Sequence, residues 1–133
     1  MRNDLLIAIE KHMQANKDNP FVMAVSDADG NLARYAAWEG REDWPHPSAV
    51  SIITSETASA RFDFDDSEFE WEMHIYSESL TELNMLADEC RHLFSRKTIT
   101  GKGCEFDCIW HEIVVDIRDE DTQPFHAAVA FSA

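Results

Sequence analysis

The sequence is short of cysteine, of long apolar runs and of positive charge. Three cysteines among 133 residues form no disulfide framework, so we expect a reducing compartment. No apolar run approaches the roughly 18 residues that a membrane-spanning helix needs, and we expect no membrane segment. The N-terminal segment turns polar at Glu10 and lacks a small-residue cleavage site, so we expect no signal peptide.

Positive charge is the scarcest property. The chain has 11 Lys and Arg against 26 Asp and Glu, a formal net charge of −15 at pH 7. Nucleic-acid binding depends on basic side chains that displace counterions, so we expect no direct, sequence-specific nucleic-acid binding. Docking onto an anionic membrane surface is disfavoured for the same reason. Solubility is the plainer explanation for a charge of this size.

The few basic residues are unevenly placed. No Lys or Arg lies between Arg61 and Arg91. The acidic residues of that segment are Asp63, Asp65, Asp66, Glu68, Glu70, Glu72, Glu78, Glu82, Asp88 and Glu89. Four basic residues then follow closely, namely Arg91, Arg96, Lys97 and Lys102. This segregation predicts two surface poles that suit head-to-tail packing of copies, although chance produces such a pattern too.

Catalytic motifs are missing. The sequence has no nucleophile elbow, no phosphate-binding loop and no H-E-x-x-H. Neighbouring carboxylates such as Asp65-Asp66 fall in turn-like segments, where aspartate bonds to nearby backbone. We therefore expect no enzyme, no catalytic residue and no cofactor.

Cysteine and histidine gather in one stretch that could suggest zinc. The residues are Cys90, His92, Cys104, Cys108 and His111. Zinc prefers such ligands, but no C-x-x-C pair is present. In a strand from residue 104 onward, Cys104 and Cys108 share one face and His111 points to the other. We expect these cysteines to be core residues and no metal to be bound, and a small metal-binding protein is the least favoured alternative.

Hydrophobic periodicity predicts two helices. Helical spacing from Leu5 to Met13 predicts the first, which Asn19-Pro20 ends. Ser79 with Glu82 forms a capping box for the second, whose apolar residues continue to Phe94.

Short runs of β-type residues predict the strands. They cover residues 21–25 and 31–37 (a hairpin), 49–56, 69–76, 104–117 and 125–132. Residues 69–76 alternate strictly, so one face is buried. We expect that face to pack on the second helix, with Phe69, Trp71, Met73 and Ile75 against Leu83, Leu86, Cys90 and Leu93. The chain thus reads as a single α+β domain over residues 1–133. It should hold a mostly antiparallel sheet of four to six strands with two helices packed on one face.

Residues 38–48 read as an exposed loop that contains Trp38 and Trp44. Large apolar side chains usually find something to cover them, and aromatic residues are enriched at subunit contacts. We therefore expect these tryptophans to lie at an interface.

Three segments resemble phage tail terminator proteins, also called tail completion proteins. Met73-His74-Ile75-Tyr76-Ser77-Glu78-Ser79, followed by LNMLADECRHLF up to Phe94, is similar to the family's central strand and helix. Residues 114–122 with 125–131 are similar to its last hairpin, in which an acidic turn precedes a final apolar strand. Trp44-Pro45-His46-Pro47 resembles the proline-containing entry to its first main strand.

The resemblance implies a structural virion protein. Its copies would form a ring, usually of six, that caps the tail tube and joins it to the head, in the virion or the host cytoplasm. The implied partners are other copies of the chain, the tail tube protein and the head–tail connector proteins. The candidate interface residues are Trp38, Trp44, Arg91, Arg96, Lys97, Asp63, Asp65 and Asp66. The alternative from another class is an acidic DNA-mimic inhibitor.

Overall fold

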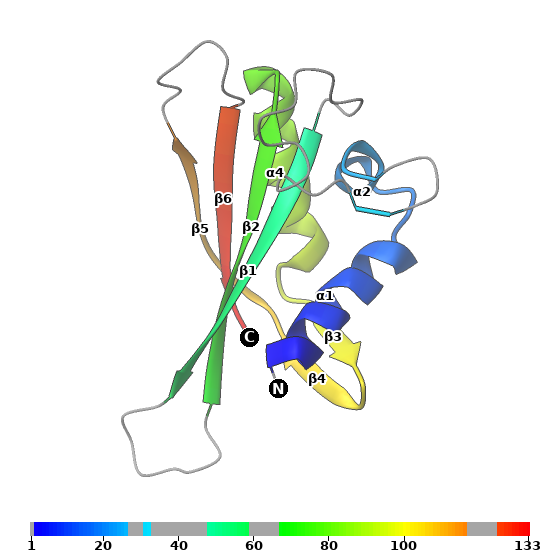
Figure 1. The fold of residues 1–133 in the computed structure, drawn as a ribbon, viewed down its shortest axis with the longest axis vertical. Coiled ribbons are helices and arrows are strands. Elements are labelled where there is room, and N and C mark those ends of the chain that lie inside the picture. The colour runs from blue at the N-terminus through cyan, green and yellow to red at the C-terminus, as the bar shows by residue number, and fades with distance from the viewer. Residues whose placement is uncertain (1, 27–30, 33–47, 59–66, 117–124) are drawn as a thin grey trace.

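The computed structural model describes residues 2–26, 31–32, 48–58, 67–116 and 125–133, which form three helices and six strands (Figure 1). In chain order the elements are α1 (Arg2–Ala15), α2 (Pro20–Ala24), β1 (Ser48–Ala58), β2 (Ser67–Ser77), α4 (Leu80–Phe94), β3 (Thr98–Gly101), β4 (Cys104–Asp107), β5 (Ile109–Asp116) and β6 (Phe125–Ser132).

Four strands form one antiparallel sheet in the order β1-β2-β6-β5, and β3 pairs with β4 as a separate antiparallel hairpin. The helices lie on one side of the four-stranded sheet (Figure 1). The predicted α+β class is therefore confirmed, with an antiparallel sheet and its two long helices, α1 and α4, on one face. The short helix α2 was not expected.

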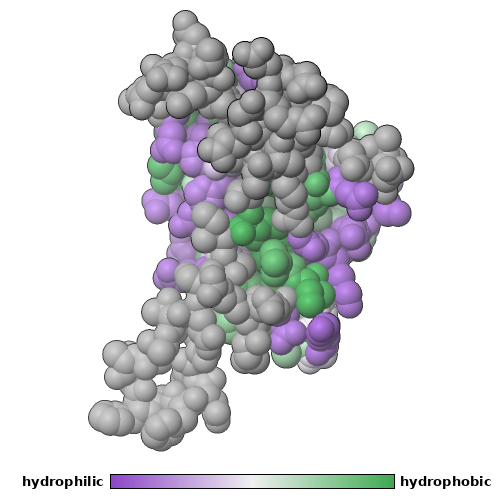
Figure 2. Space-filling model, viewed as in Figure 1, coloured by the Kyte–Doolittle hydropathy of each residue, from purple (hydrophilic) through white to green (hydrophobic). Residues whose placement is uncertain are grey.

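The buried face of the sheet packs against α4. Buried residues of β2, α4 and β6 are Phe69, Trp71, Met73, Ile75, Leu83, Leu86, Ala87, Cys90, Leu93, Phe94, Ala127, Val129 and Phe131. The Trp71 ring stacks on Phe131 at 4.4 Å between centroids and meets Phe94 edge-on at 4.9 Å. Figure 2 shows hydrophobic residues gathered between the sheet and the helices, with hydrophilic residues on the flanks. The predicted core of β2 and α4 is confirmed.

Helix α4 begins where the sequence indicates. The Ser79 side chain accepts a hydrogen bond from the backbone N–H of Glu82 at 3.3 Å, which satisfies one of the free amides of the first turn. The helix ends at Phe94. Backbone bonds then attach the chain to the start of β5: the Arg96 N–H donates to Cys108 O, and the Cys108 N–H donates to Lys97 O, both at 2.9 Å.

The strand predicted over residues 21–25 is wrong, because Pro20–Ala24 is helical. Asn19 accepts hydrogen bonds from the N–H groups of Phe21 and Val22, and Pro20 occupies the first turn. These are signals that start a helix, since proline lacks the amide that a first turn leaves unpaired. A single antiparallel bridge joins Ser26 to Leu32, and the rest of the predicted hairpin, residues 33–37, lies outside the described residues.

The single strand predicted over residues 104–117 is also wrong, because the chain changes sheets at Cys108. Residues before it form β4, which pairs with β3, and residues after it form β5. Lys102 and Gly103 make the β3–β4 turn with φ of 48° and 81°. Positive φ at both central residues is the turn geometry that matches the twist of two-residue hairpins.

The backbone of helix α1 approaches strand β3 closely at Gly101. A Cβ atom at Gly101 would stand 2.6 Å from the backbone oxygen of Asp4 and 2.8 Å from the backbone nitrogen of Ala8. The apolar face of α1 is buried there, as expected from its helical spacing: Leu5, Ala8, Ile9 and Met13. The helix is also held to α4 by a 2.8 Å contact between His12 Nε2 and Leu93 O.

Gly101→Ala should therefore push α1 away from the hairpin. Because the clash is with backbone, we expect a loss of about 1–3 kcal/mol in the free energy of unfolding, measured in urea. The control is Gly103→Asn, since Gly103 has open space around it and asparagine tolerates its positive φ. Equal losses from the two variants would contradict the close approach of α1.

Leu86→Ala should test the packing of α4 on the sheet. Leu86 is fully buried, and truncation leaves a cavity, so we expect a loss of about 2–5 kcal/mol in the same measurement. Met85→Ala is the matched control, because Met85 lies one position away on the same helix and is 43% exposed. A loss well below about 1 kcal/mol for Leu86→Ala would show that the helix packs elsewhere.

Candidate functional site

The four-stranded sheet has a face turned away from the helices, which we call the open face. Its described side chains on β2, β5 and β6 include Glu70, Glu72, His74, Tyr76, Glu112, Val114, Asp116, His126, Ala128, Ala130 and Ser132, all exposed or partly exposed. They alternate with the buried residues along each strand. The face therefore combines carboxylates, histidines and small residues, without cover from any described helix.

A continuous chain of polar contacts crosses the open face from β2 through β6 to β5. His74 Nε2 lies 2.7 Å from Glu72 Oε2, and His74 Nδ1 lies 2.7 Å from His126 Nε2. His126 Nδ1 lies 2.5 Å from Asp116 Oδ2. Tyr76 stacks on the His126 ring, with centroids 4.6 Å apart. All four ring nitrogens are thus engaged inside the chain, and in this arrangement none is directed at a substrate.

Basic residues gather where α4 ends, on the helix side of the sheet. We call this surface the basic end: Arg91, Arg96 and Lys97. Arg91 lies over the Trp110 ring, 4.0 Å from its centroid, which is close enough for a cation–π contact. Arg96 has a φ of 60°, the left-handed conformation common just after a helix, and its side chain is exposed.

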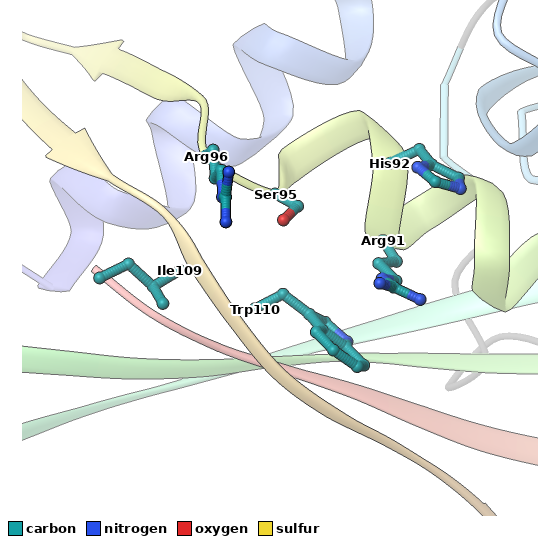
Figure 3. A pocket seen from close by; sticks show the side chains of 6 residues that line it. All are labelled: Arg91, His92, Ser95, Arg96, Ile109 and Trp110. Carbon is teal, nitrogen blue, oxygen red and sulfur yellow. The ribbon is translucent and has the colours of Figure 1, made fainter.

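A hollow of about 440 Å³ opens beside these residues. It is lined by Arg91, His92, Ser95, Arg96, Ile109 and Trp110. Figure 3 shows Arg91 extending from α4 toward Trp110 of β5, and Arg96 on the segment that follows α4. Two of the hollow's polar lining residues are arginines, and Ile109 is 57% exposed, so it suits an acidic group beside an apolar one.

The cysteine and histidine stretch does not come together as a ligand set. Within the described part of the chain, no three His, Cys, Asp or Glu side chains are placed to hold a metal ion. Cys90 and Cys108 are buried in the core, whereas His92 and His111 are exposed. Burial raises the pKa of the Cys90 thiol and raises that of Cys108 to about 12. Both are therefore neutral thiols at pH 7.

Of the candidate interface residues, the structure brings Arg91, Arg96 and Lys97 together at the basic end. Trp38, Trp44, Asp63, Asp65 and Asp66 lie outside the described residues.

The histidine chain was missed at the sequence level. Its only signal there is that His74 and His126 alternate with apolar residues on two strands.

No protein-family model matches the chain, and no curated protein matches it significantly. Among the described residues, no helix is long and apolar enough to cross a membrane. The functional argument therefore depends on the surfaces described above and on the resemblance in sequence.

The three cysteines should differ in their rates of reaction with a thiol reagent. We expect Cys104, which is partly exposed, to react first with a thiol reagent at pH 8, and Cys90 and Cys108 only after unfolding. The raised pKa of Cys108 stabilises the fold below pH 9.0, the value for an unburied thiol, and this stabilisation is lost as pH rises toward about 12. Wild-type protein should therefore lose more stability than Cys108→Ala between those values. Rapid labelling of Cys108 in the folded protein would contradict its burial.

Proposed function

We propose that this chain is a phage tail terminator (tail completion) protein. In this proposal it is a structural component of the virion, assembled in the host cytoplasm. Its copies form a ring, of six as the resemblance implies, at the head-proximal end of the tail tube. The ring binds the tube protein on one side and the head–tail connector on the other.

The position of the resembling segments supports this proposal. Strand β2 leads directly into α4, β6 lies beside β2, and β5 lies beside β6. The segments that carry the resemblance are thus neighbours in one sheet-and-helix unit, as parts of a shared structural core should be. Residues 44–47, which precede β1, lie outside the described residues.

The distribution of charge is the main support for head-to-tail contacts between copies. Exposed carboxylates, such as Glu70 and Glu112, lie on the open face, and the exposed cations Arg96 and Lys97 lie just after α4. The helix side also bears exposed Asp88, Glu105 and Asp107, so its positive charge is confined to the basic end. Opposite charges on different sides of one chain favour a heterologous contact, and such contacts close into rings when the rotation permits. Charge of this kind orients the approach and adds little affinity. An acidic ring would also repel passing DNA.

Affinity would come from apolar contacts. Burying one of Trp38 or Trp44 against a neighbour would contribute roughly 1.5–3 kcal/mol by area alone. This part of the proposed interface stays a prediction from the sequence.

The DNA-mimic alternative requires carboxylates that stand free in rows like phosphates. On the open face, Glu72 and Asp116 are instead bonded to histidines. These two carboxylates are therefore not free acceptors in a phosphate-like row, which favours assembly over mimicry.

Charge reversal can test the proposed contact. We expect the variant Arg96→Glu with Lys97→Glu, and separately Glu70→Lys with Glu112→Lys, to lose ring formation in light scattering and negative-stain images. An equal mixture of the two variants should form rings again, because each restores an opposite-charge contact with the other. Images should be taken with and without isolated tail tubes, since a terminator can stay monomeric until it meets the tube.

The control is Lys11→Glu with Lys17→Glu, which changes net charge by the same amount as Arg96→Glu with Lys97→Glu, at exposed positions outside both surfaces. Circular dichroism should be unchanged in all variants. Normal assembly by either single-sided variant, or failure of the mixture, would contradict the proposed contact between the open face and the basic end.

A further inference from the structure

We propose that His74 and His126 form a proton-sharing pair that binds one proton more than two neutral histidines would. This pair would make the pairing of β2, β6 and β5 depend on pH. The inference concerns the open face of a single chain and holds whether or not the chain forms a ring.

The two imidazole rings meet edge to edge. Their planes differ by 14°, and their centroids are 4.9 Å apart, while the nearest nitrogens are only 2.7 Å apart. The distance between the ring centroids is larger than the N···N distance by about two ring radii. The two nitrogens therefore lie on the line between the centroids. This is the orientation in which one ring's N–H points at the lone pair of the other.

Proton counting follows from the three contacts. Glu72 to His74, His74 to His126, and His126 to Asp116 are each at hydrogen-bond distance, and each bond needs one proton. Ionised carboxylates bring none, and two neutral imidazoles bring two. Three bonds therefore require one additional proton, whichever tautomers are present, and the four side chains together carry a charge of −1.

A fourth proton would break the arrangement. With both rings fully protonated, two N–H groups would face each other across the 2.7 Å contact, and the rings would separate. With only two protons, one of the three contacts would set a lone pair against another acceptor. The three-proton state is thus the one that satisfies every contact.

The surroundings favour a single cation. Charged and titratable groups of this face are Glu72, Tyr76 and Glu70 on β2 and Asp116 and Glu112 on β5. On β1, position 51 lies opposite His74 in the register and is a serine. The His74 and His126 side chains are only 15% and 21% exposed, so water screens the attraction to their carboxylates only in part.

Folding stability should then pass through a maximum with pH. In the folded state the pair binds one proton more than two neutral imidazoles. In the unfolded chain, two free imidazoles together bind one such extra proton at about pH 6.5. Below that pH the unfolded chain binds more protons than the folded pair, so stability rises with pH. Above it the folded pair binds more, so stability falls. The contribution of the pair therefore peaks near the value for free histidine.

Nitrogen NMR of the wild-type side chains tests the proton count. At about pH 8, where free imidazoles are mostly neutral, the ¹⁵N shifts of His74 and His126 should together account for three protonated nitrogens. Their titration should proceed in two separated steps shared by both rings. His111, whose Nε2 contacts Ser132 Oγ at 2.8 Å on the same sheet, is the internal control. Two protonated nitrogens at that pH, with independent single steps, would overturn the proposal.

A stability profile gives a second readout. The difference in Tm between wild type and His74→Gln should be bell-shaped in pH, whereas the difference for His111→Gln should be flat. A His74→Gln difference that is flat or rises steadily with pH would overturn the proposal. Added Zn²⁺ that displaces the shared proton and raises Tm, reversibly with chelator, would also overturn it and mark the pair as a metal site. If His74→Gln fails to fold, the wild-type NMR titration still decides the matter.

Discussion

Trp71 contacts Phe131 of the neighbouring strand and Phe94 of α4, and most of the remaining architecture depends on this three-ring contact. It joins the middle of the sheet to the end of the helix that covers it. With the end of α4 fixed there, the backbone bonds between residues 96–97 and Cys108 set where β5 begins. The position of the basic end is therefore a consequence of how the core is packed.

The sheet is covered by described helices on one side only, and this asymmetry gives the surfaces their different chemistry. Along each strand, the side chains that face the helices are apolar. The side chains between them, which face the other way, are carboxylates, histidines and alanines. The cations collect beside α4, where the carbonyl end of a helix favours positive charge. A chain built this way presents unlike surfaces in different directions, which is what the proposed ring requires.

The parts of the fold with strong periodicity could be predicted from the sequence. The alternation of Phe69 to Tyr76 and the capped apolar stripe of α4 each depend on one short segment, and both are confirmed. Asn19-Pro20 was interpreted as the end of a helix, although the same pair begins α2. The histidine chain could not be predicted, because its contacts depend on the register between β2 and β6, and no local pattern sets that register.

The order of the strands has a consequence for folding. Strand β6 comes last along the chain but lies between β2 and β5. The β1–β2 hairpin and β5 therefore do not pair with each other directly. The four-stranded sheet is complete only when β6 pairs with both β2 and β5. Pairings as distant as His74 with Ala128 must form at that step, and closing such long loops is slow. Until then the buried face of β2 lacks Phe131, so a nascent or partly unfolded chain exposes the side of the Trp71 ring that Phe131 covers.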